Sequence, residues 1–428
     1  MTTRIINAAL PSADAAGTIL IEDGRITAVE TDPATGHHRS PRTLPSGTGV
    51  SESAASEIGA PETIDAGGRL VLPGLINAHA HIDKTLYGGP WVSAVQAESV
   101  AERIAHERRE RDALGLPSPQ YISALIETMV AAGTAHIRTH TDVDPGVGLL
   151  GITTVAEVAQ RYAHAVDVEQ VAFPQGGLIT NPGTLDLLRD AVDAGATAIG
   201  GLDPAGFDNA PNAHLEAIFT LAASTGTRLD IHLHDGGTLG AWEMSLIADM
   251  TEDFDLAGRV AISHAFGIDH APTQLRLLER FAEAGIALVN AAVYDSPVPP
   301  LRACAEAGVT VAGGTDGIND LWGPFGDGDM LRRAMLLAYR NEARADRELE
   351  LALDTVTTNA ARVLGIDDYG LEPGRPADLT IVEARSAAEA VATVPKRRIV
   401  LKSGRPVARD GAFTGATAEG QAHIGSSA

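Results

Sequence analysis

The chain has 428 residues, 56 of them acidic and 32 basic, so its formal net charge is −24. Hydrophobic residues make up 44% and charged residues 21%, which is typical of a globular protein and excludes a mainly disordered chain. An acidic protein repels phosphate backbones and anionic lipids, so neither nucleic acid nor membrane is expected as a partner. The lack of a secretory pattern and the single cysteine, Cys304, favour a cytoplasmic location.

The N-terminal segment is expected to form short strands. The runs IINAAL and GTILIEDGRITAVE have strand-like patterns, and Asp23-Gly24 is a hairpin turn signal. Residues 31–61 are rich in Pro, Gly, Ser and Thr without periodicity, which predicts a long surface loop.

From residue 62 onward, apolar runs alternate with amphipathic helical stretches. The predicted strands are RLVLPGLINAH, TAHIRTHTD, VEQVAFPQ, ATAIGGLD, RLDIHLHD, RVAISHA, IALVNAAV and VTVAGGTD. The clearest helices are ISALIETMVAAG, TLDLLRDAVDAG, AHLEAIFTLAASTG and TQLRLLERFAEAG. Eight strands alternating with helices over roughly 250 residues predict an α/β fold of the (β/α)₈ TIM-barrel type.

The segment after residue 316 is expected to hold helices at about 327–342 and 348–364, followed by the strand-like DLTIVEA and RRIVLKSGRPVARDG. Strand-rich segments at both ends of the chain predict one small β-sandwich domain built from the two termini. The predicted domains are therefore 1–70 with 375–428 for the composite β domain, and 71–374 for a metal-dependent hydrolase barrel.

The segment LPGLINAHAHIDK, residues 72–84, contains the first candidate metal-binding residues along the chain. His79 and His81 are two residues apart, so on a strand both imidazoles point to the same face. They stand at the carboxyl end of the first predicted barrel strand, where barrel active sites are built. Two neutral imidazoles are costly to bury unless a divalent metal uses their lone pairs. The alternative is a pair of hydrogen-bonded core histidines.

Further ligand-type residues recur at the same end of other predicted strands. RLDIHLHD ends with His232 and His234, AISHA carries His264, and VAGGTDG carries Asp316. Singly, such residues are usually structural or capping, but their convergence on one rim favours a metal site. Three imidazoles and a carboxylate, with one position open for water, form a catalytic set that Zn²⁺ or Fe²⁺ accepts.

The order of these motifs resembles the amidohydrolase superfamily, in particular its cytosine deaminase and N-isopropylammelide isopropylaminohydrolase branch. The resemblance covers nearly the whole chain. Besides the HxH pair, it rests on HIDK at 81–84, RTHTDVDP at 138–145, VAFPQGG at 171–177, LDIHLHD at 229–235, ISHAF at 262–266 and TDGINDLW at 315–322.

The resemblance implies one divalent metal ion, Zn²⁺ or Fe²⁺, with the ligands His79, His81, His232 and Asp316. His264 would contact the metal-bound water or the substrate carbonyl. Asp235 occupies the position of the glutamate that shuttles protons in the deaminases. Gln175 would bind the substrate by hydrogen bonding, and Trp322 would wall the pocket.

The lysines distinguish between one and two metals. The chain has only Lys84, Lys396 and Lys402, so no lysine from the middle of the barrel is available to bridge two ions as a carbamate. A single metal is therefore expected. The resemblance suggests that Lys84 faces the substrate, and a salt bridge with Asp83 or another neighbour is the alternative.

These residues predict a metal-dependent aminohydrolase, or deaminase, that acts on a small N-heterocycle or cyclic amidine and releases ammonia or an amine. A bound metal lowers the pKa of water from about 15.7 to near 7. Asp316 would then accept the proton of this water, Asp235 would protonate the ring or the departing amine, and His264 would stabilise the attacking oxygen.

Departures from the cytosine deaminase pattern bear on the substrate. Asp235 stands where those enzymes carry glutamate, and Gly176 and Gly317 stand where they carry acidic residues. Without these acidic side chains, donors on a bound cytosine would stay unpaired, and each unpaired donor would cost ~1–3 kcal/mol of binding free energy. Cytosine is therefore disfavoured as the substrate. We therefore expect a pocket opened by two glycines for a larger or less polar ring, or for an N-substituted amine.

Several alternatives remain at this point. One is hydrolysis of a non-peptide amide or carbamate C–N bond, and another is a barrel whose four-ligand metal is only structural. In RTHTDVDP, His140 or Asp142 would orient the metal histidines from behind, or the aspartates would cap the loop. By resemblance, the chain is expected to form a homo-oligomer.

Overall fold

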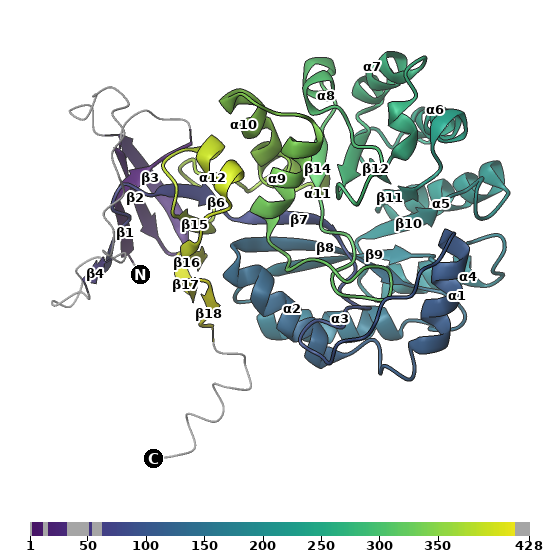
Figure 1. The fold of residues 1–428 in the computed structure, drawn as a ribbon, viewed down its shortest axis with the longest axis horizontal. Helices are drawn as coiled ribbons and strands as arrows, with labels where there is room; N and C mark the ends of the chain where they lie inside the picture. Colours follow the sequence, from purple (N-terminus) through teal and green to yellow (C-terminus); the bar gives the residue numbers. More distant parts are fainter. Residues whose placement is uncertain (1, 12–15, 32–50, 54–61, 416–428) are drawn as a thin grey trace.

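The computed structural model describes residues 2–11, 16–31, 51–53 and 62–415. These residues form a barrel surrounded by helices, with a second β-sheet on one side of it (Figure 1). The predicted fold class, a barrel with a small β unit built from both ends of the chain, is confirmed. Among the described residues, no helix is both long and apolar enough to cross a membrane.

The barrel consists of eight parallel strands, each paired with the next one along the chain. They are β7 Leu75–Ala80, β8 Thr134–Asp142, β9 Asp167–Phe173, β10 Ala198–Leu202, β11 Arg228–Leu233, β12 Val260–His264, β13 Ala287–Asn290 and β14 Val311–Gly313. A parallel bridge between Ala80 and Asp316 brings the segment after β14 against β7 and nearly closes the ring.

Most of the helices cover the outside of the barrel and bury their apolar faces on it, whereas the last one packs on two other helices (Figure 1). They are α1 Val100–Glu110, α2 Pro119–Ala131, α3 Leu150–Tyr162, α4 Thr184–Asp193, α5 Pro211–Thr225, α6 Gly237–Asp253, α7 Gln274–Ala284, α8 Leu301–Ala307, α9 Met330–Arg340, α10 Asp346–Asp354, α11 Thr358–Leu364 and α12 Ala387–Thr393. The helix predicted for 348–364 is two helices, α10 and α11, and α12 was not predicted.

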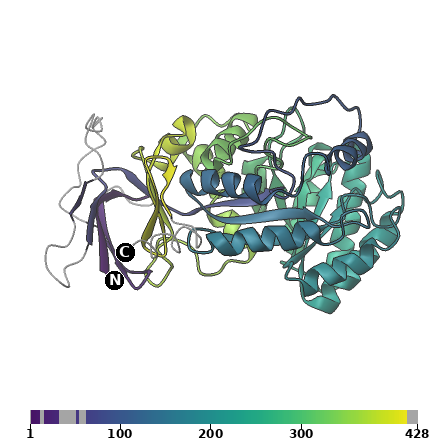
Figure 2. The same cartoon turned by 90° about the horizontal axis from the view of Figure 1, so that it is seen from below.

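The second sheet combines strands from both ends of the chain, and Figure 2 shows it beside the barrel. Its strands are β1 Thr2–Ala9, β2 Ala16–Glu22, β3 Arg25–Thr31, β4 Ser51–Ser53, β5 Glu62–Asp65, β6 Leu70–Pro73, β15 Leu379–Val382, β16 Arg397–Lys402, β17 Arg405–Arg409 and β18 Ala412–Phe413. They form one hydrogen-bonded sheet whose N-terminal and C-terminal halves share an apolar core, for example Ile19 with Ile381 and Ile399. The domain boundaries at 70/71 and 374/375 remain predictions.

Two glycines, one in a turn and one at a close contact, explain local features of this sheet. Asp23 and Gly24 both have positive φ (48° and 81°), as the turn between β2 and β3 requires. The run RLVLPGLINAH, predicted as one strand, divides at Gly74 between the two sheets, where a Cβ would lie 2.5 Å from that of Ala135. Most of the loop predicted for 31–61 lies outside the described residues, but Ser51–Ser53 pair with β5 as a strand.

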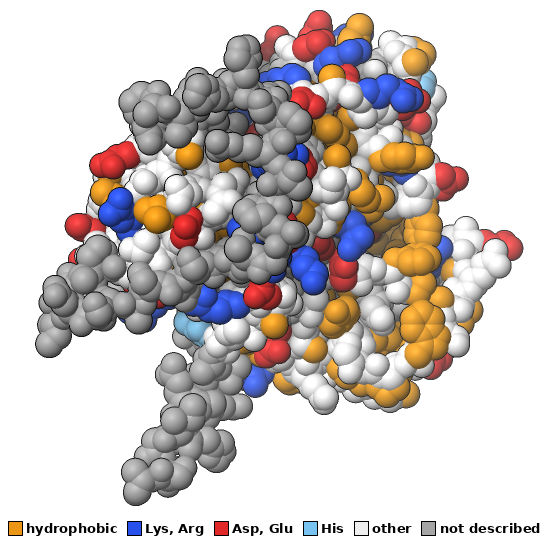
Figure 3. Space-filling model, turned by 60° about the vertical axis from the view of Figure 1, so that its left-hand side comes forward, with side chains coloured by type: hydrophobic (Ala, Val, Ile, Leu, Met, Phe, Trp, Pro, Cys, Tyr) orange, Lys and Arg blue, Asp and Glu red, His pale blue; other side chains and the backbone are white. Residues whose placement is uncertain are grey.

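Charged side chains of both signs are interspersed on the face drawn in Figure 3. One basic residue, however, is buried where the second sheet meets the barrel. Lys402 on β16 lies 2.6 Å from Asp378 and 2.5 Å from Asp167 of β9. Burial alone would raise the pKa of Asp378, but the hydrogen bond with His136 and the charge of Lys402 lower it to about 2. The ion pair therefore ties β16 to the barrel.

Replacing Lys402 with alanine is expected to lower the free energy of unfolding by about 3 kcal/mol, because Asp378 stays buried without its ion-pair partner. Urea unfolding followed by circular dichroism measures the effect. Lys396→Ala removes the same charge from an exposed position and should cost less than ~0.5 kcal/mol. Equal stability of the two variants would contradict the structural role of Lys402.

Candidate active site

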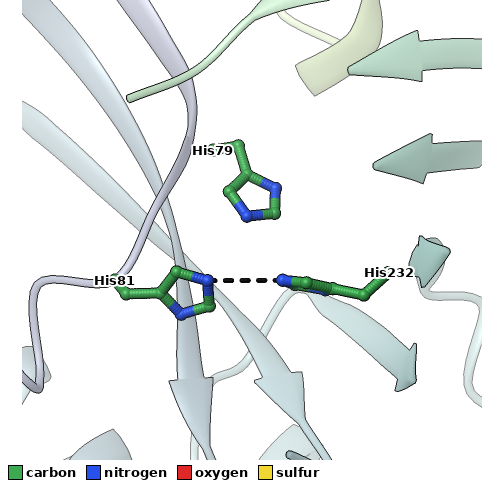
Figure 4. Close-up of side chains that lie close together, drawn as sticks. All are labelled: His79, His81 and His232. Carbon is green, nitrogen blue, oxygen red and sulfur yellow. Dashed lines mark hydrogen bonds between the residues drawn. The ribbon is translucent and has the colours of Figure 1, made fainter. Parts of the chain in front are cut away.

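The carboxyl ends of the barrel strands bring four predicted metal ligands together. His79 and His81 lie on and just after β7, His232 lies on β11, and Asp316 follows β14. Figure 4 shows the three imidazoles turned toward one point. The Nε2 atoms of His81 and His232 are 3.3 Å apart. Asp316 Oδ1 is 3.3 Å from Nε2 of His81 and 3.7 Å from Nε2 of His79.

These distances fit a divalent metal ion. Nitrogen and oxygen ligands at ~2.0–2.2 Å from a tetrahedral ion are separated by about 3.3–3.6 Å. His79 Nε2 is buried and has no hydrogen-bond partner among the described residues, so its lone pair is free for such an ion. Burial and the charge of Lys84 lower the pKa of His81 to about 4, and burial holds that of His232 well below 6.5. The His81 and His232 imidazoles are therefore neutral, as metal ligands must be.

Hydrogen bonds behind two of these histidines set their tautomers. The Ser263 hydroxyl donates to Asp230 at 2.6 Å, so its oxygen accepts a hydrogen bond from His79 Nδ1 at 2.8 Å. His81 Nδ1 donates to the backbone carbonyl of His140 at 3.0 Å. Both Nδ1 atoms therefore carry the hydrogen, which leaves both Nε2 lone pairs directed at the site.

Asp230 is the buried charge on which this support depends. Its side chain is fully buried within the barrel and accepts a hydrogen bond from Arg138 at 3.2 Å. Burial would raise the pKa of Asp230, but the nearby His140 and Arg138 side chains hold it far below its ordinary value. His140 also stacks on His79, with 4.0 Å between ring centroids. The His140 ring thus packs directly against a predicted metal ligand.

The two aspartates of RTHTDVDP have other contacts. Asp142 accepts a hydrogen bond from Lys84 at 2.8 Å. Asp144 accepts hydrogen bonds from the backbone of Gly146 and Val147, as a loop-capping residue does, and pairs with Arg108. Neither aspartate makes a hydrogen bond to a predicted metal histidine in the described part of the chain.

The rim of the site contains strained backbone. His264, Ala265 and Asp316 have positive φ values of 67°, 55° and 61°, which are unfavourable for residues other than glycine. Asp316 is held there by a hydrogen bond from its N–H to the carbonyl of His79. Gly314 allows this approach, because a Cβ at that position would lie 2.4 Å from the Cβ of His79.

His264 is placed beside the predicted ligands. Its ring centroid is 5.0 Å from those of His79 and His232, and its Nε2 is buried without a hydrogen-bond partner in the described residues. Burial lowers the pKa of His264 well below its ordinary value, so the ring is neutral. His234 stacks on it at 4.3 Å and is bound through Nδ1 by Asp203 at 2.9 Å.

Asp235, the predicted proton shuttle, has different partners. It accepts a hydrogen bond from the Gly206 N–H at 2.8 Å, and burial together with the charge of Asp203 raises its pKa. Burial and the Asp235 charge raise the pKa of Glu243 to about 8. No hydrogen bond or ion pair of the described residues joins Asp235 to a predicted metal ligand, so its shuttle role remains a prediction.

Next to the predicted metal site lies a buried polar cluster, which we call the lysine cluster: Lys84, Glu107, Asp142, Gln175 and Trp322. Lys84 donates to Asp142 and to the Gln175 carbonyl oxygen, and it lies 3.8 Å from Glu107. Gln175 donates to Glu107 and Asp142, each at 3.0 Å, and Trp322 donates to Glu107. Burial lowers the pKa of Lys84, but the surrounding carboxylates raise it above its ordinary value overall.

The lysine cluster unites all three predicted substrate-binding residues. The Lys84 ammonium lies 5.7 Å from the ring centroid of Phe173, which stacks on His232 at 4.0 Å. The Phe173 ring therefore lies between the Lys84 ammonium and the predicted metal ligand His232. Lys84 thus forms a buried ion pair with a neighbour, Asp142, as the salt-bridge alternative expected. That Lys84 faces the substrate remains a prediction.

The two glycines do not open the pocket, so that expectation was wrong. A Cβ at Gly317 would lie 1.9 Å from the carboxylate of Asp320, and a Cβ at Gly176 would lie 1.8 Å from the guanidinium of Arg108. Both spaces are thus filled by charged side chains from other positions. Burial raises the pKa of Asp320 to about 7.

Several residues of the site were not predicted. Asp230 is on the same face of its strand as His232, and Arg138 is on that of His140, so strand alternation was a usable signal. Glu107 had no such signal. It lies in VAERIAHERRE, which resembles an exposed helix, yet Glu107 is only 2% exposed.

Comparison with known proteins agrees with this geometry. A model of the amidohydrolase family matches residues 112–408. The chain is 31% identical over 365 residues to the N-isopropylammelide isopropyl amidohydrolase of Pseudomonas sp. (strain ADP), covering 82% of this chain and 88% of that protein.

Two solved structures are similar over almost the whole chain. The N-isopropylammelide isopropylaminohydrolase of Burkholderia multivorans is 40% identical with a TM-score of 0.86, covering 96% of this chain and 100% of that one. The 5-methylcytosine deaminase of Klebsiella pneumoniae is 26% identical with a TM-score of 0.78, covering 95% and 98%.

The barrel, the histidine cluster and these matches define a metal-dependent hydrolase. The chain belongs to the amidohydrolase family. The branch predicted from the motifs is confirmed, as is the predicted class of enzyme, a hydrolase of carbon–nitrogen bonds other than peptide bonds.

Replacing Ser263 with alanine is expected to weaken Zn²⁺ binding by ~10–100-fold, because His79 loses the acceptor that fixes its tautomer. Competition with a chromophoric chelator measures the affinity. Ser245→Ala, on α6 away from the site, removes a hydroxyl bonded only to the carbonyl of Ala241 and should leave the affinity unchanged. Equal affinities of the two variants would contradict the role of Ser263.

Replacing Gly314 with alanine is expected to reduce Zn²⁺ affinity by at least ~10-fold, because the added methyl group pushes the segment carrying Asp316 away from His79. The same competition assay applies. Gly236→Ala, where a Cβ meets nothing within 4 Å, is the control. Unchanged affinity in a folded Gly314→Ala protein would show that the close approach is not needed.

Proposed function

We propose that this chain is a mononuclear metal-dependent aminohydrolase that removes ammonia or an amine from a small N-heterocycle or cyclic amidine. The observation that carries the proposal is the clustering of the His79, His81 and His232 imidazoles at the barrel mouth. Asp316 Oδ1 lies beside this cluster, 3.3 Å from His81 and 3.7 Å from His79. His79, His81, His232 and Asp316 would hold the ion. When bound, such an ion supplies an ionised water at neutral pH.

The residues around the ligands have complementary tasks. Asp316 Oδ1 faces the site and would accept a proton during attack on the substrate. His264, with its unpaired Nε2, would hydrogen-bond the attacking or developing oxygen. A proton for the leaving amine would come from Asp235, whose pKa is raised by burial and by the charge of Asp203.

The lysine cluster would bind the ring. Lys84 and Gln175 offer donors and Glu107 an acceptor, all nearly buried, so a substrate edge bearing both carbonyl and N–H groups fits them. Arg108 beside Gly176 adds a further donor for an oxygen substituent. We therefore infer a polar, carbonyl-bearing heterocycle instead of an apolar one, with Trp322 as one wall.

Three finer predictions belong to this proposal. The ion is Zn²⁺ or Fe²⁺, since both accept a three-nitrogen, one-oxygen set. The enzyme works as a homo-oligomer, as expected from the resemblance. It resides in a reducing cytoplasm, where its single thiol, Cys304, stays reduced; this thiol is buried and free, and burial raises its pKa to about 12.

A substrate panel tests the activity. Purified protein is assayed with pyrimidines, triazines, pterins and N-alkyl amides, and ammonia or amine release is measured. Release from a ring without ring opening supports the proposal, whereas a new carboxylate would indicate amide or carbamate hydrolysis. Inactivity toward all rings, with activity on an amide, would overturn the substrate class.

Variants of the ligands test the site. Asp316→Asn is expected to lower kcat by ~10²–10⁴-fold through loss of the proton acceptor, and His79→Ala should reduce metal content from about one ion per chain to near zero. Asp193→Asn and His164→Ala change the same residue types at exposed positions and serve as controls. Full activity in Asp316→Asn and His79→Ala would end the proposal.

A further inference from the structure

The opposite end of the barrel, where the strands begin, contains a cavity. Its volume is about 190 Å³, and its walls come from the first residues of β11, β12 and β13 and from α11. Four arginines line it: Arg138, Arg228, Arg259 and Arg362. Apolar side chains such as Leu229 and Val260 form the remaining wall.

The cavity is unusual in its charge. The chain as a whole carries −24, and basic side chains on the face shown in Figure 3 are interspersed with acidic ones. Around the cavity, by contrast, no carboxylate of the described residues lies within ion-pair distance of Arg228, Arg259 or Arg362. Burial, followed by the charge of Arg138, lowers the pKa of Arg228, while Glu169 and Asp367 oppose this shift.

One of the residues that line the cavity also has a donor without a partner in the described part of the chain. Arg138 is 1% exposed, and it donates through Nε to Glu169 and through Nη1 to Asp230. Its Nη2 is buried and has no hydrogen-bond partner among the described residues. Leaving a charged donor unpaired in a barrel interior costs ~1–3 kcal/mol or more.

We propose that this cavity is a binding site for a small oxyanion such as phosphate. Arg138 would donate Nη2 from the inner wall, and Arg228 and Arg259 would approach from the strand ends β11 and β12. Guanidinium groups are well suited to this task, because their planar forks match the spacing of oxyanion oxygens.

The size of the cavity limits the ligand. At ~30 Å³ per water molecule, 190 Å³ holds about six waters, which is room for phosphate or a short carboxylate. Sites for drug-sized molecules begin at about 300 Å³, so a nucleotide does not fit.

The oxyanion site is distinct from the catalytic mouth but shares a hydrogen-bonded chain with it. Arg138 binds Asp230, Asp230 accepts from Ser263, and Ser263 accepts from His79. An oxyanion on Arg138 would therefore complete the polar chain that begins at a predicted metal ligand.

Thermal unfolding at constant ionic strength tests the proposal, with sodium phosphate as the probe and sodium chloride as the reference. Phosphate in ~100-fold excess over its Kd is expected to raise Tm by about 2–5 °C. The rise should persist in His79→Ala, which separates it from phosphate binding at a catalytic metal. No rise over chloride in the unmodified protein would overturn the proposal.

The double variant Arg228→Gln/Arg259→Gln should lose the phosphate effect, with at least a tenfold weaker apparent affinity by titration calorimetry. The control Arg302→Gln/Arg347→Gln removes the same charge from exposed helical positions and should keep the effect. Arg259→Gln alone, expected to weaken binding several-fold, replaces the double variant if that protein does not fold. Retention of the full effect without these arginines would overturn the proposal.

Discussion

The fully buried carboxylate of Asp230 is the charge on which the interior of this barrel depends. It neutralises Arg138 on one side and, through Ser263, orients His79 on the other. A barrel interior is a packed core, so a charge placed there must have well-formed partners. Asp230 satisfies this condition, and the orientation of a predicted metal ligand follows from it.

Closure of the barrel supplies the second constraint. Asp316 reaches the histidines only because the segment after β14 runs against β7, with the Asp316 N–H bonded to the His79 carbonyl. That approach needs Gly314 without a side chain and a left-handed backbone at Asp316. The strain is local and is offset by the backbone pairing, a common arrangement at functional sites.

The sequence predicted the barrel and the histidine positions well, because both follow from short-range rules. Strand alternation places His79 and His81 on one face, and parallel strands bring their carboxyl ends to one rim. The same rule, applied further, would have added Asp230 and Arg138. Glu107 was beyond its reach, since α1 has an ordinary charged pattern and its burial depends on the packing of Gln175 and Trp322.

The glycines at 176 and 317 show why substrate preference is harder to predict than chemistry. Each was expected to leave space, yet Arg108 and Asp320 occupy those spaces from other positions in the chain. A sequence motif shows which residue occupies a position, but it does not show which side chain from elsewhere in the chain fills the space beside a glycine. Ligand residues at strand ends are fixed by the sheet, whereas pocket residues come from loops and helices that pack independently of the motif. The polarity of this pocket is therefore determined jointly by the strand ends, loops and helices that surround it, and a single motif does not predict it.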